Sequence, residues 1–176
     1  QPSASAPFVL MNGSETVGTY NTWKEALSAY QAGYTLKLGA NYTLVDSDLW
    51  SGFGGFERVS IDLNGYTINS QNTKNSLIWA KSTNKTKTTV VLKNGGVGLK
   101  NRPLISYEDS SSAGAGKVFD IALENVTLTL AKDAMLTEMI SASAVNGSIA
   151  VSSDISLTEC SVTVSEVARA DHALII

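Results

Sequence analysis

The octapeptide IDLNGYTI at residues 61–68 contains the pattern that decides the fold. It combines an apolar-x-apolar strand segment at residues 61–63, the strong turn signal Asn64-Gly65, and a second β-favouring segment that ends at Ile68. The first strand segment recurs along the chain as Leu36 with Leu38, Ile61 with Leu63, Val90 with Leu92, Ile121 with Leu123, and Ile155 with Leu157. Such self-similarity indicates a repeat architecture.

The other parts of the octapeptide recur in the same order. A turn position follows each first segment: Gly39, Asn64-Gly65, Asn94-Gly95, Asn125 and, less typically for a turn, Glu159. The second segment returns as Tyr66 with Ile68, Val97 with Leu99, Val126 with Leu128 and Leu130, and Val162 with Val164. A third, short segment is Leu77-Ile78, Leu104-Ile105, Met139-Ile140 and Leu174-Ile175. Because Asn94 and Asn125 share one column, we expect a short amide ladder inside the stack.

The spacing of these copies predicts the fold class. The first segments start at residues 36, 61, 90, 121 and 155, which lie 25, 29, 31 and 34 residues apart. We therefore predict an all-β fold, a right-handed parallel β-helix that forms a three-faced solenoid of about five coils. Like residues would stack, with Ile61, Val90, Ile121 and Ile155 directly over one another. A β-sandwich is the alternative, but it gives no reason for three segments to recur in a fixed order.

The N-terminal region has a different pattern. The turn signal Asn12-Gly13 between two β-favouring segments predicts a hairpin over residues 8–20. A helix is expected next, because Thr22 and Glu25 match a capping box and apolar residues follow at helical spacing. Gly33 is expected to stop this helix in a left-handed conformation. The helix would cap the open end of the solenoid core, where strand edges are otherwise unpaired.

The chain is predicted to be one structural domain in three parts. These parts are a disordered leader at residues 1–7, the hairpin and capping helix at residues 8–34, and the β-helix coils at residues 35–176. The apolar segment ALII at residues 173–176 has no polar cap after it. We therefore expect a fragment of a longer protein, and end-to-end self-association through the C-terminal coil.

Composition excludes several classes of partner. Charged residues make up 16% of the 176 residues, and the formal net charge is -3 with no run of Lys or Arg. Nucleic acid is therefore not an expected partner. No apolar run approaches the roughly 20 residues that span a bilayer. Cys160 is the only cysteine, which rules out an intramolecular disulfide and a thiolate zinc site, and we expect it to be a small core residue.

Two segments carry a resemblance to a known family. They are FVLMNGSETVGTYNTWKEALSAYQAGYTLKLGANYTL at residues 8–44, which holds a T-x-x-E-A and a G-x-T-x-x-L motif, and VSIDLNGYTI at residues 59–68. They resemble the opening of pectate-lyase-like right-handed parallel β-helix regions in adhesin-type, cell-surface proteins of Gram-positive bacteria. The likeness covers about the first 70 residues. It implies the fold, a secreted or cell-surface location, and adhesion, display or glycan contact, but its motifs are structural and transfer no catalytic residue.

A parallel β-helix also suggests a polysaccharide lyase or glycoside hydrolase. Either enzyme would need clustered carboxylates, with a Lys or Arg base for a lyase, on one outer face. The outward positions of the first segments hold at most one carboxylate per coil, and Lys93 beside Glu124 is interpreted as an exposed ion pair. His172 is the only histidine and lies near the C-terminal end, so no Ser-His-Asp or Cys-His arrangement is expected. We predict no catalytic residue.

Two acidic pairs are the candidate metal ligands. Asp46 with Asp48, and Glu108 with Asp109, lie in expected loops where carboxylate oxygens could collect a calcium ion. Neither pair has the ligand count of a recognised calcium loop, and solvated turn residues are the interpretation we favour. The sequence therefore predicts no metal and no cofactor.

Aromatic residues are the candidate ligand-binding side chains. Trp79 and Tyr107 fall just after third-segment strands, and Trp50 borders the glycine-rich stretch SGFGGF at residues 51–56. Exposed aromatic rings stack on the apolar faces of sugars, so these three residues are the predicted glycan contacts. Packing into the core or a loop is the alternative for each ring.

These observations favour a non-enzymatic, secreted or cell-surface module of a bacterial protein. It would act as a spacer or adhesive display surface, with a surface glycan or host ligand as partner. A carbohydrate-active enzyme of the pectate-lyase-like fold is the alternative, and a capping segment whose active coils follow Ile176 is a third hypothesis.

Overall fold

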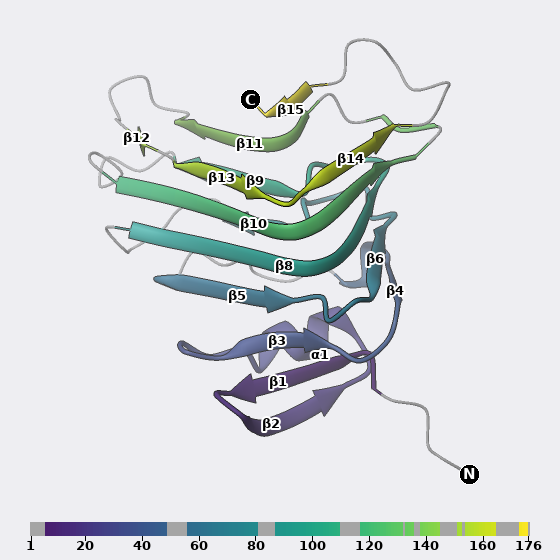
Figure 1. Ribbon diagram of the computed structural model, residues 1–176, viewed down its shortest axis with the longest axis vertical. Coiled ribbons are helices and arrows are strands. Elements are labelled where there is room, and N and C mark those ends of the chain that lie inside the picture. Colours follow the sequence, from purple (N-terminus) through teal and green to yellow (C-terminus); the bar gives the residue numbers. More distant parts are fainter. Residues whose placement is uncertain are drawn as a thin grey trace.

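Strands make up most of the structure (Figure 1). This computed structural model describes residues 6–48, 56–80, 87–109, 117–131, 133–135, 138–144, 151–152, 154–164 and 173–175. The helical elements in these residues are the α-helix α1 (Trp23–Ser28) and the 3-10 helix η1 (Asp46–Asp48). The all-β prediction is therefore confirmed.

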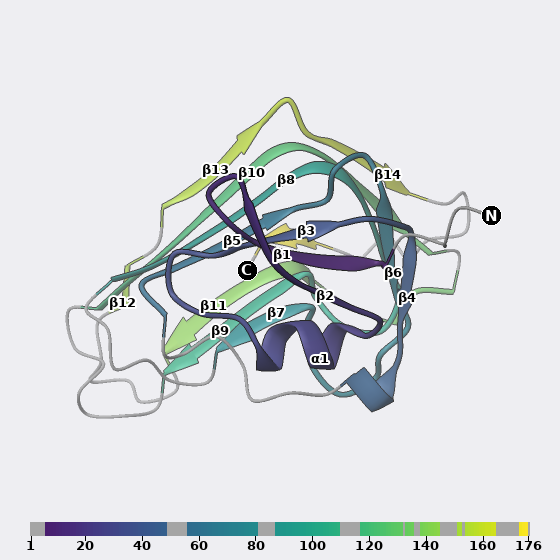
Figure 2. The ribbon, with the colours of Figure 1, turned by 90° about the horizontal axis from the view of Figure 1, so that it is seen from below.

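The strands form two sheets. The larger sheet contains β1 (Phe8–Asn12), β2 (Glu15–Tyr20), β3 (Thr35–Leu38), β4 (Tyr42–Leu44), β5 (Arg58–Asp62), β6 (Thr67–Ser70), β8 (Lys87–Leu99), β10 (Lys117–Leu130), β12 (Val151–Ser152), β13 (Ile155–Thr158) and β14 (Ser161–Val164). The smaller sheet contains β7 (Ile78–Ala80), β9 (Ile105–Asp109), β11 (Glu138–Ala144) and β15 (Ala173–Ile175). Figure 2 shows β7, β9 and β11 lying across from β5, β8 and β10.

Parallel pairing dominates both sheets. In the larger sheet the antiparallel pairs are those of β1 with β2 and of β1 with β3, and the other described pairs of both sheets are parallel. The antiparallel part follows from the predicted hairpin, because a two-residue turn can only reverse the chain. Gly13 takes the left-handed conformation there, with φ 62°. The larger sheet is consequently mixed.

Register places the apolar residues of successive strands in rows. One row contains Val59, Val90, Ile121 and Ile155, and the next contains Leu36, Ile61, Leu92, Leu123 and Leu157. The stacking of Val90, Ile121 and Ile155 is therefore confirmed, but Ile61 pairs with Leu92 and not with Val90. Asp62 pairs with Lys93 and Thr67 with Gly96, so residues 63–66 of one corner correspond to residues 94–95 of the next. The longer corner shifts the register by two residues.

The second and third segments also align as rows. One row contains Tyr42, Ile68, Val97, Leu128 and Val162. Another contains Ile78, Ile105, Ile140 and Ile175. Side chains whose burial is described in these rows, such as Ile68, Val97 and Ile105, belong to one apolar core. Burial of this continuous core is the main stabilising contribution, at about 25 cal/mol per Å² of apolar surface.

The corners between first and second segments share one backbone conformation. Asn64, Asn94, Asn125 and Glu159 have positive φ values of 53°, 63°, 54° and 53°. We expected a break in each strand here, but β8 and β10 continue through their corners. Because both strands bend at the same place, their pairing resumes immediately, with Val126 opposite Gly95.

An amide ladder links successive corners. The Asn125 Nδ2 donates to Asn94 Oδ1 at 3.3 Å, and the Asn94 Nδ2 donates to Asp62 Oδ1 at 3.4 Å. The predicted contact between the two asparagines is therefore confirmed. Asn125 is exposed, however, so the ladder runs along the surface and not inside the stack.

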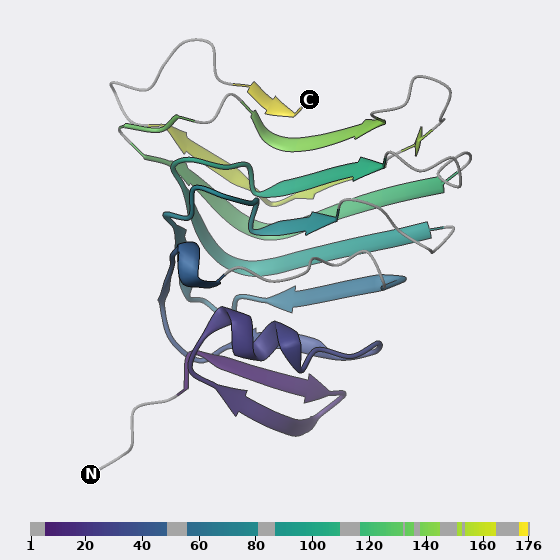
Figure 3. The ribbon, with the colours of Figure 1, turned by 180° about the vertical axis from the view of Figure 1, so that it is seen from behind.

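Helix α1 lies beside β1 and β2 (Figure 3). The Thr22 hydroxyl accepts from the Glu25 backbone N–H at 3.2 Å, as the capping-box pattern predicts. The Trp23 ring packs edge-on against Phe8 with ring centroids 5.8 Å apart. Gly33 has φ 86°, but the helix has already ended at Ser28. The prediction that Gly33 stops the helix is wrong, and its left-handed conformation instead serves the turn that leads into β3.

Glu159 is the weak position of the corner column, and we predict that Glu159→Asn stabilises the protein. Positive φ is strained for a glutamate but tolerated by asparagine. We expect the free energy of unfolding to rise by about 0.5–1 kcal/mol, measured by urea denaturation. The control is Glu124→Asn, which removes the same charge from an exposed strand position. Equal effects of the two substitutions would contradict this account of the corner.

Candidate functional site

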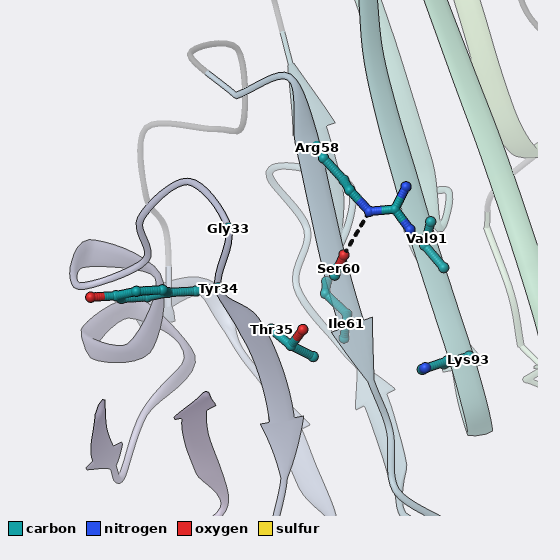
Figure 4. A pocket seen from close by; sticks show the side chains of 8 residues that line it. All are labelled: Gly33, Tyr34, Thr35, Arg58, Ser60, Ile61, Val91 and Lys93. Atoms are coloured by element: carbon teal, nitrogen blue, oxygen red, sulfur yellow. Dashed lines mark hydrogen bonds between the residues drawn. The ribbon is translucent and has the colours of Figure 1, made fainter. Parts of the chain in front are cut away.

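A hollow of about 320 Å³ lies on the outer face of the larger sheet (Figure 4). It is lined by Gly33, Tyr34, Thr35, Arg58, Ser60, Ile61, Val91 and Lys93. These residues come from the turn before β3 and from β3, β5 and β8, which the parallel pairing holds side by side. Segments separated by up to 60 residues of chain, from Gly33 to Lys93, therefore build one site.

Strand alternation decides which side chains line the hollow. Thr35, Ser60 and Val91 form one row across β3, β5 and β8. Their neighbours in the chain, such as Ile61 and Leu92, have buried side chains, so the row of Thr35 faces outward. It provides two hydroxyl groups and one apolar side chain at the base of the hollow.

Two cationic side chains flank this row. Arg58 is opposite Thr89, and Lys93 lies four residues beyond Thr89 on β8, which corresponds to about 13 Å of backbone at the usual rise of a parallel strand. Figure 4 shows Arg58 reaching from β5 toward β8, and Lys93 reaching from β8 toward β5. The two cations therefore approach one space from different strands.

Hydrogen bonding orients Arg58 and leaves its end free. Its Nε donates to the Ser60 Oγ at 3.2 Å. Its two terminal nitrogens have no hydrogen-bond or ion-pair partner among the described residues. The guanidinium thus keeps two parallel N–H donors available on the side away from Ser60.

Lys93 is also without an ion-pair partner in the described part of the chain. Glu124 is its neighbour on β10, but the two side chains do not form the ion pair that the sequence predicted. Asp62 is its neighbour on β5, but the Asp62 carboxylate accepts from the Asn64 backbone N–H at 2.9 Å and from Asn94. The corner therefore engages Oδ1 of the carboxylate that lies opposite Lys93.

Tyr30 fixes the wall of the hollow. Its hydroxyl donates to the Tyr34 carbonyl at 2.9 Å and accepts from the Ser60 backbone N–H at 3.1 Å. Burial raises the pKa of Tyr30, while the bond from Ser60 and the charge of Arg58 oppose that rise. The neutral hydroxyl ties the turn before β3 to strand β5.

Sequence reasoning missed this hollow. Arg58 precedes the first apolar residue of its strand, so the repeat pattern did not include it. Gly33 and Tyr34 belong to a segment outside the repeats. The available signal was the alternation of strand side chains. Val59 and Ile61 are buried, so the residues between and beside them, Arg58, Ser60 and Asp62, lie on the outer face.

The predicted aromatic residues do not form one row. Trp79 lies within β7 and not after it, and is half-buried. Its buried indole Nε1 has no hydrogen-bond partner among the described residues. Tyr107 lies within β9, opposite Ala80, whereas Trp79 is opposite Ser106. Trp50 lies outside the described residues. Glycan stacking by these three rings stays a prediction.

The acidic pair Asp46 and Asp48 has a structural role. Asp48 is buried and accepts from the Tyr42 hydroxyl at 2.7 Å and from the Val45 backbone N–H at 3.1 Å. Asp46 accepts from the backbone N–H and hydroxyl of Thr73 at 2.7 and 2.8 Å, and these bonds lower its pKa. The interpretation as solvated turn residues is wrong for Asp48.

The other candidate residues are one acidic pair, the histidine and the cysteine. Glu108 and Asp109 end strand β9, and His172 lies outside the described residues. Cys160 is half-buried against the core, and its thiol lies 3.3 Å from the Leu123 carbonyl oxygen. Within the described residues, no three His, Cys, Asp or Glu side chains are grouped to hold a metal ion.

Comparisons with known proteins gave no match: no family model, no curated protein and no solved structure is significantly similar to the chain. In the part of the chain that the structure describes, no helix has both the length and the apolar character needed to cross a bilayer.

We predict that Tyr42→Phe lowers the free energy of unfolding by about 1–2 kcal/mol, because buried Asp48 loses a hydrogen-bond donor. Tyr66→Phe is the matched control, since no hydrogen bond of its hydroxyl occurs among the described residues. Burial and the Asp48 contact raise the pKa of Tyr42 to about 12. Its contribution is thus complete below pH 10 and lost as pH rises toward 12. Urea unfolding and ultraviolet titration measure both effects; equal losses in the two variants would contradict this assignment.

Proposed function

We propose that the chain is a non-enzymatic, extracellular module of a bacterial surface protein, folded as a right-handed parallel β-helix of the pectate-lyase-like kind. Three observations support the fold proposal. Each first, second or third segment pairs with the equivalent segment of the next repeat, these pairs are parallel, and the three kinds of segment recur in the same order along the chain. In this proposal, α1 caps one end of the core. The module acts as a stiff spacer and display surface that contacts glycans.

The hollow beside Arg58 is the observation that carries the binding part of the proposal. It presents hydroxyl, cationic and apolar groups from three paired strands, which backbone hydrogen bonds hold about 4.8 Å apart. A rigid concave surface of this kind binds a ligand without the loss of conformational entropy that the ordering of a loop would cause. Trp79, Tyr107 and Trp50 remain the proposed aromatic contacts elsewhere on the module.

A carbohydrate-active enzyme is the alternative function. Hydrolysis of a glycosidic bond ordinarily needs two carboxyl groups about 5–9.5 Å apart. The groups that line the hollow are hydroxyls and cations, and nearby Asp120 is engaged by Lys87 at 3.1 Å and by the Asp154 backbone N–H at 3.0 Å. The described lining therefore lacks the carboxyl pair that a hydrolase uses.

Self-association through the C-terminal coil is a further part of the proposal. Leu157 and Val162 are 41% and 42% exposed, although their row partners Leu123 and Leu128 are buried. Apolar residues that continue a buried row into solvent favour contact with another apolar surface. A second copy of the chain would provide such a surface.

Glycan-array screening combined with a reducing-end assay tests the proposed function. We expect binding of the intact protein to a subset of glycans, with no product released from neutral or uronate polymers. Catalytic release of oligosaccharides would establish the enzyme alternative. Absence of binding to every arrayed glycan would reduce the module to a spacer.

Light scattering tests self-association. We expect the weight-average mass to rise with concentration, and the double variant Leu157→Asn with Val162→Thr to abolish most of that rise, because it removes the exposed apolar pair. Met135→Ser is the control, since Met135 is 65% exposed and lies outside the rows. A wild-type protein that stays monomeric at its solubility limit would contradict the proposal.

A further inference from the structure

We infer that the hollow beside Arg58 and Lys93 binds a sulfate or phosphate ester carried on a sugar. This inference rests on the proposed glycan contact and specifies its chemistry. Neither Arg58 nor Lys93 forms an ion pair with another residue that the structure describes. Because Arg58 is exposed and Lys93 half-buried, both can meet a ligand from solvent.

The local charge of the hollow selects an anion. The chain as a whole has a formal net charge of -3, yet the described lining of the hollow contains two cations and no carboxylate. Asp62 and Glu124 are the acidic residues nearest in register, one on each side of Lys93, and Oδ1 of Asp62 is bonded to the corner. The two cationic side chains of the lining can attract an anion, and the apolar side chain of Val91 at the base of the hollow strengthens that attraction.

The donor arrangement favours a tetrahedral oxyanion over a carboxylate. The two terminal nitrogens of Arg58 have no partner among the residues that the structure describes, and this fork matches two oxygens of one ligand group. A carboxylate would use both of its oxygens in the contact with Arg58 and would have no third oxygen for another cation. A sulfate or phosphate ester has a third terminal oxygen that is left for a second cation, and Lys93 lines the same hollow.

The hydroxyls of the base explain why the ligand would be a sugar ester and not a bare ion. Thr35 and Ser60 lie in one row across adjacent strands, beside the oxyanion position. The Ser60 hydroxyl accepts from Arg58, so its own hydrogen remains available to donate. Hydroxyl groups of a sugar ring attached to the ester can bond with these two side chains.

Nuclear magnetic resonance titration of the full chain tests the inference. The probes are glucose 6-sulfate, glucose 6-phosphate, glucuronate and glucose, each at constant ionic strength. We expect saturable shifts of the Ser60, Val91 and Lys93 amides with the two esters, and at least about fivefold weaker binding of glucuronate and glucose. The two ester arms show which oxyanion the hollow prefers. Glucuronate binding as tightly as either ester would overturn the inference.

Matched variants locate the site. Arg58→Gln and Lys93→Gln should each weaken binding of the preferred ester about tenfold, the effect of one charge-assisted hydrogen bond. Arg58→Lys keeps the charge but removes the fork, so an intermediate loss is expected. Lys37→Gln removes the same charge from the same sheet face outside the hollow, and should change affinity less than twofold. Equal losses in Lys37→Gln and Lys93→Gln would indicate non-specific attraction and overturn the assignment.

Failure of this inference and failure of the proposed function can be told apart. Array binding to uncharged glycans that survives Arg58→Gln would keep the module proposal and overturn the ester site. Ester binding in solution without binding to any arrayed glycan would keep the ester site and overturn glycan display. Circular dichroism and the urea midpoint of each variant show that lost binding does not reflect lost folding.

Discussion

The shared bend of β8 and β10 is the constraint on which the rest of the structure depends. Asn94 and Asn125 both occupy the left-handed conformation, with φ 63° and 54°, at equivalent places in two paired strands. A bend in only one of two parallel strands would break their hydrogen-bonded ladder. Because both strands bend together, backbone groups remain paired on either side of the corner, and the apolar rows pass through it unbroken. Asparagine suits this position because its side chain tolerates positive φ and bonds to the next corner.

The register that follows from the corners also creates the hollow. The corner between β5 and β6 has two more residues than the bend in β8, so Arg58 lies opposite Thr89 and Asp62 opposite Lys93. Had the two corners been equal in length, Arg58 would have been placed opposite Lys87, and two cations would have faced each other. The longer corner therefore separates Arg58 from Lys87 and sets it diagonally across from Lys93. It also provides the Asn64 backbone N–H that engages Asp62.

Several elements could be predicted from the sequence, each for a physical reason. The corner column could be predicted because positive φ restricts the choice of residue, and even the atypical Glu159 adopts it. Rows such as Ile78 with Ile105 could be predicted because burial demands apolar side chains at matching positions. The pairing of Ile61 could not, since spacing between repeats does not show on which side of a corner extra residues fall. The hollow was equally hidden, because exposed positions such as Arg58 face no packing constraint and leave no periodic signal.

The distribution of charge links stability to binding. Described aspartates mostly hold the chain together: Asp62 bonds to a corner, Asp46 to Thr73, and Asp48 to Tyr42 and Val45. Such carboxylates accept backbone N–H groups that would otherwise lack partners at loops and turns. These bonds hold Asp62 in its corner, and it forms no ion pair with Lys93 within the described part of the chain. Lys93 therefore keeps its ammonium group available to a ligand, and the capacity of the hollow to attract an anion is linked to how the corners are stabilised.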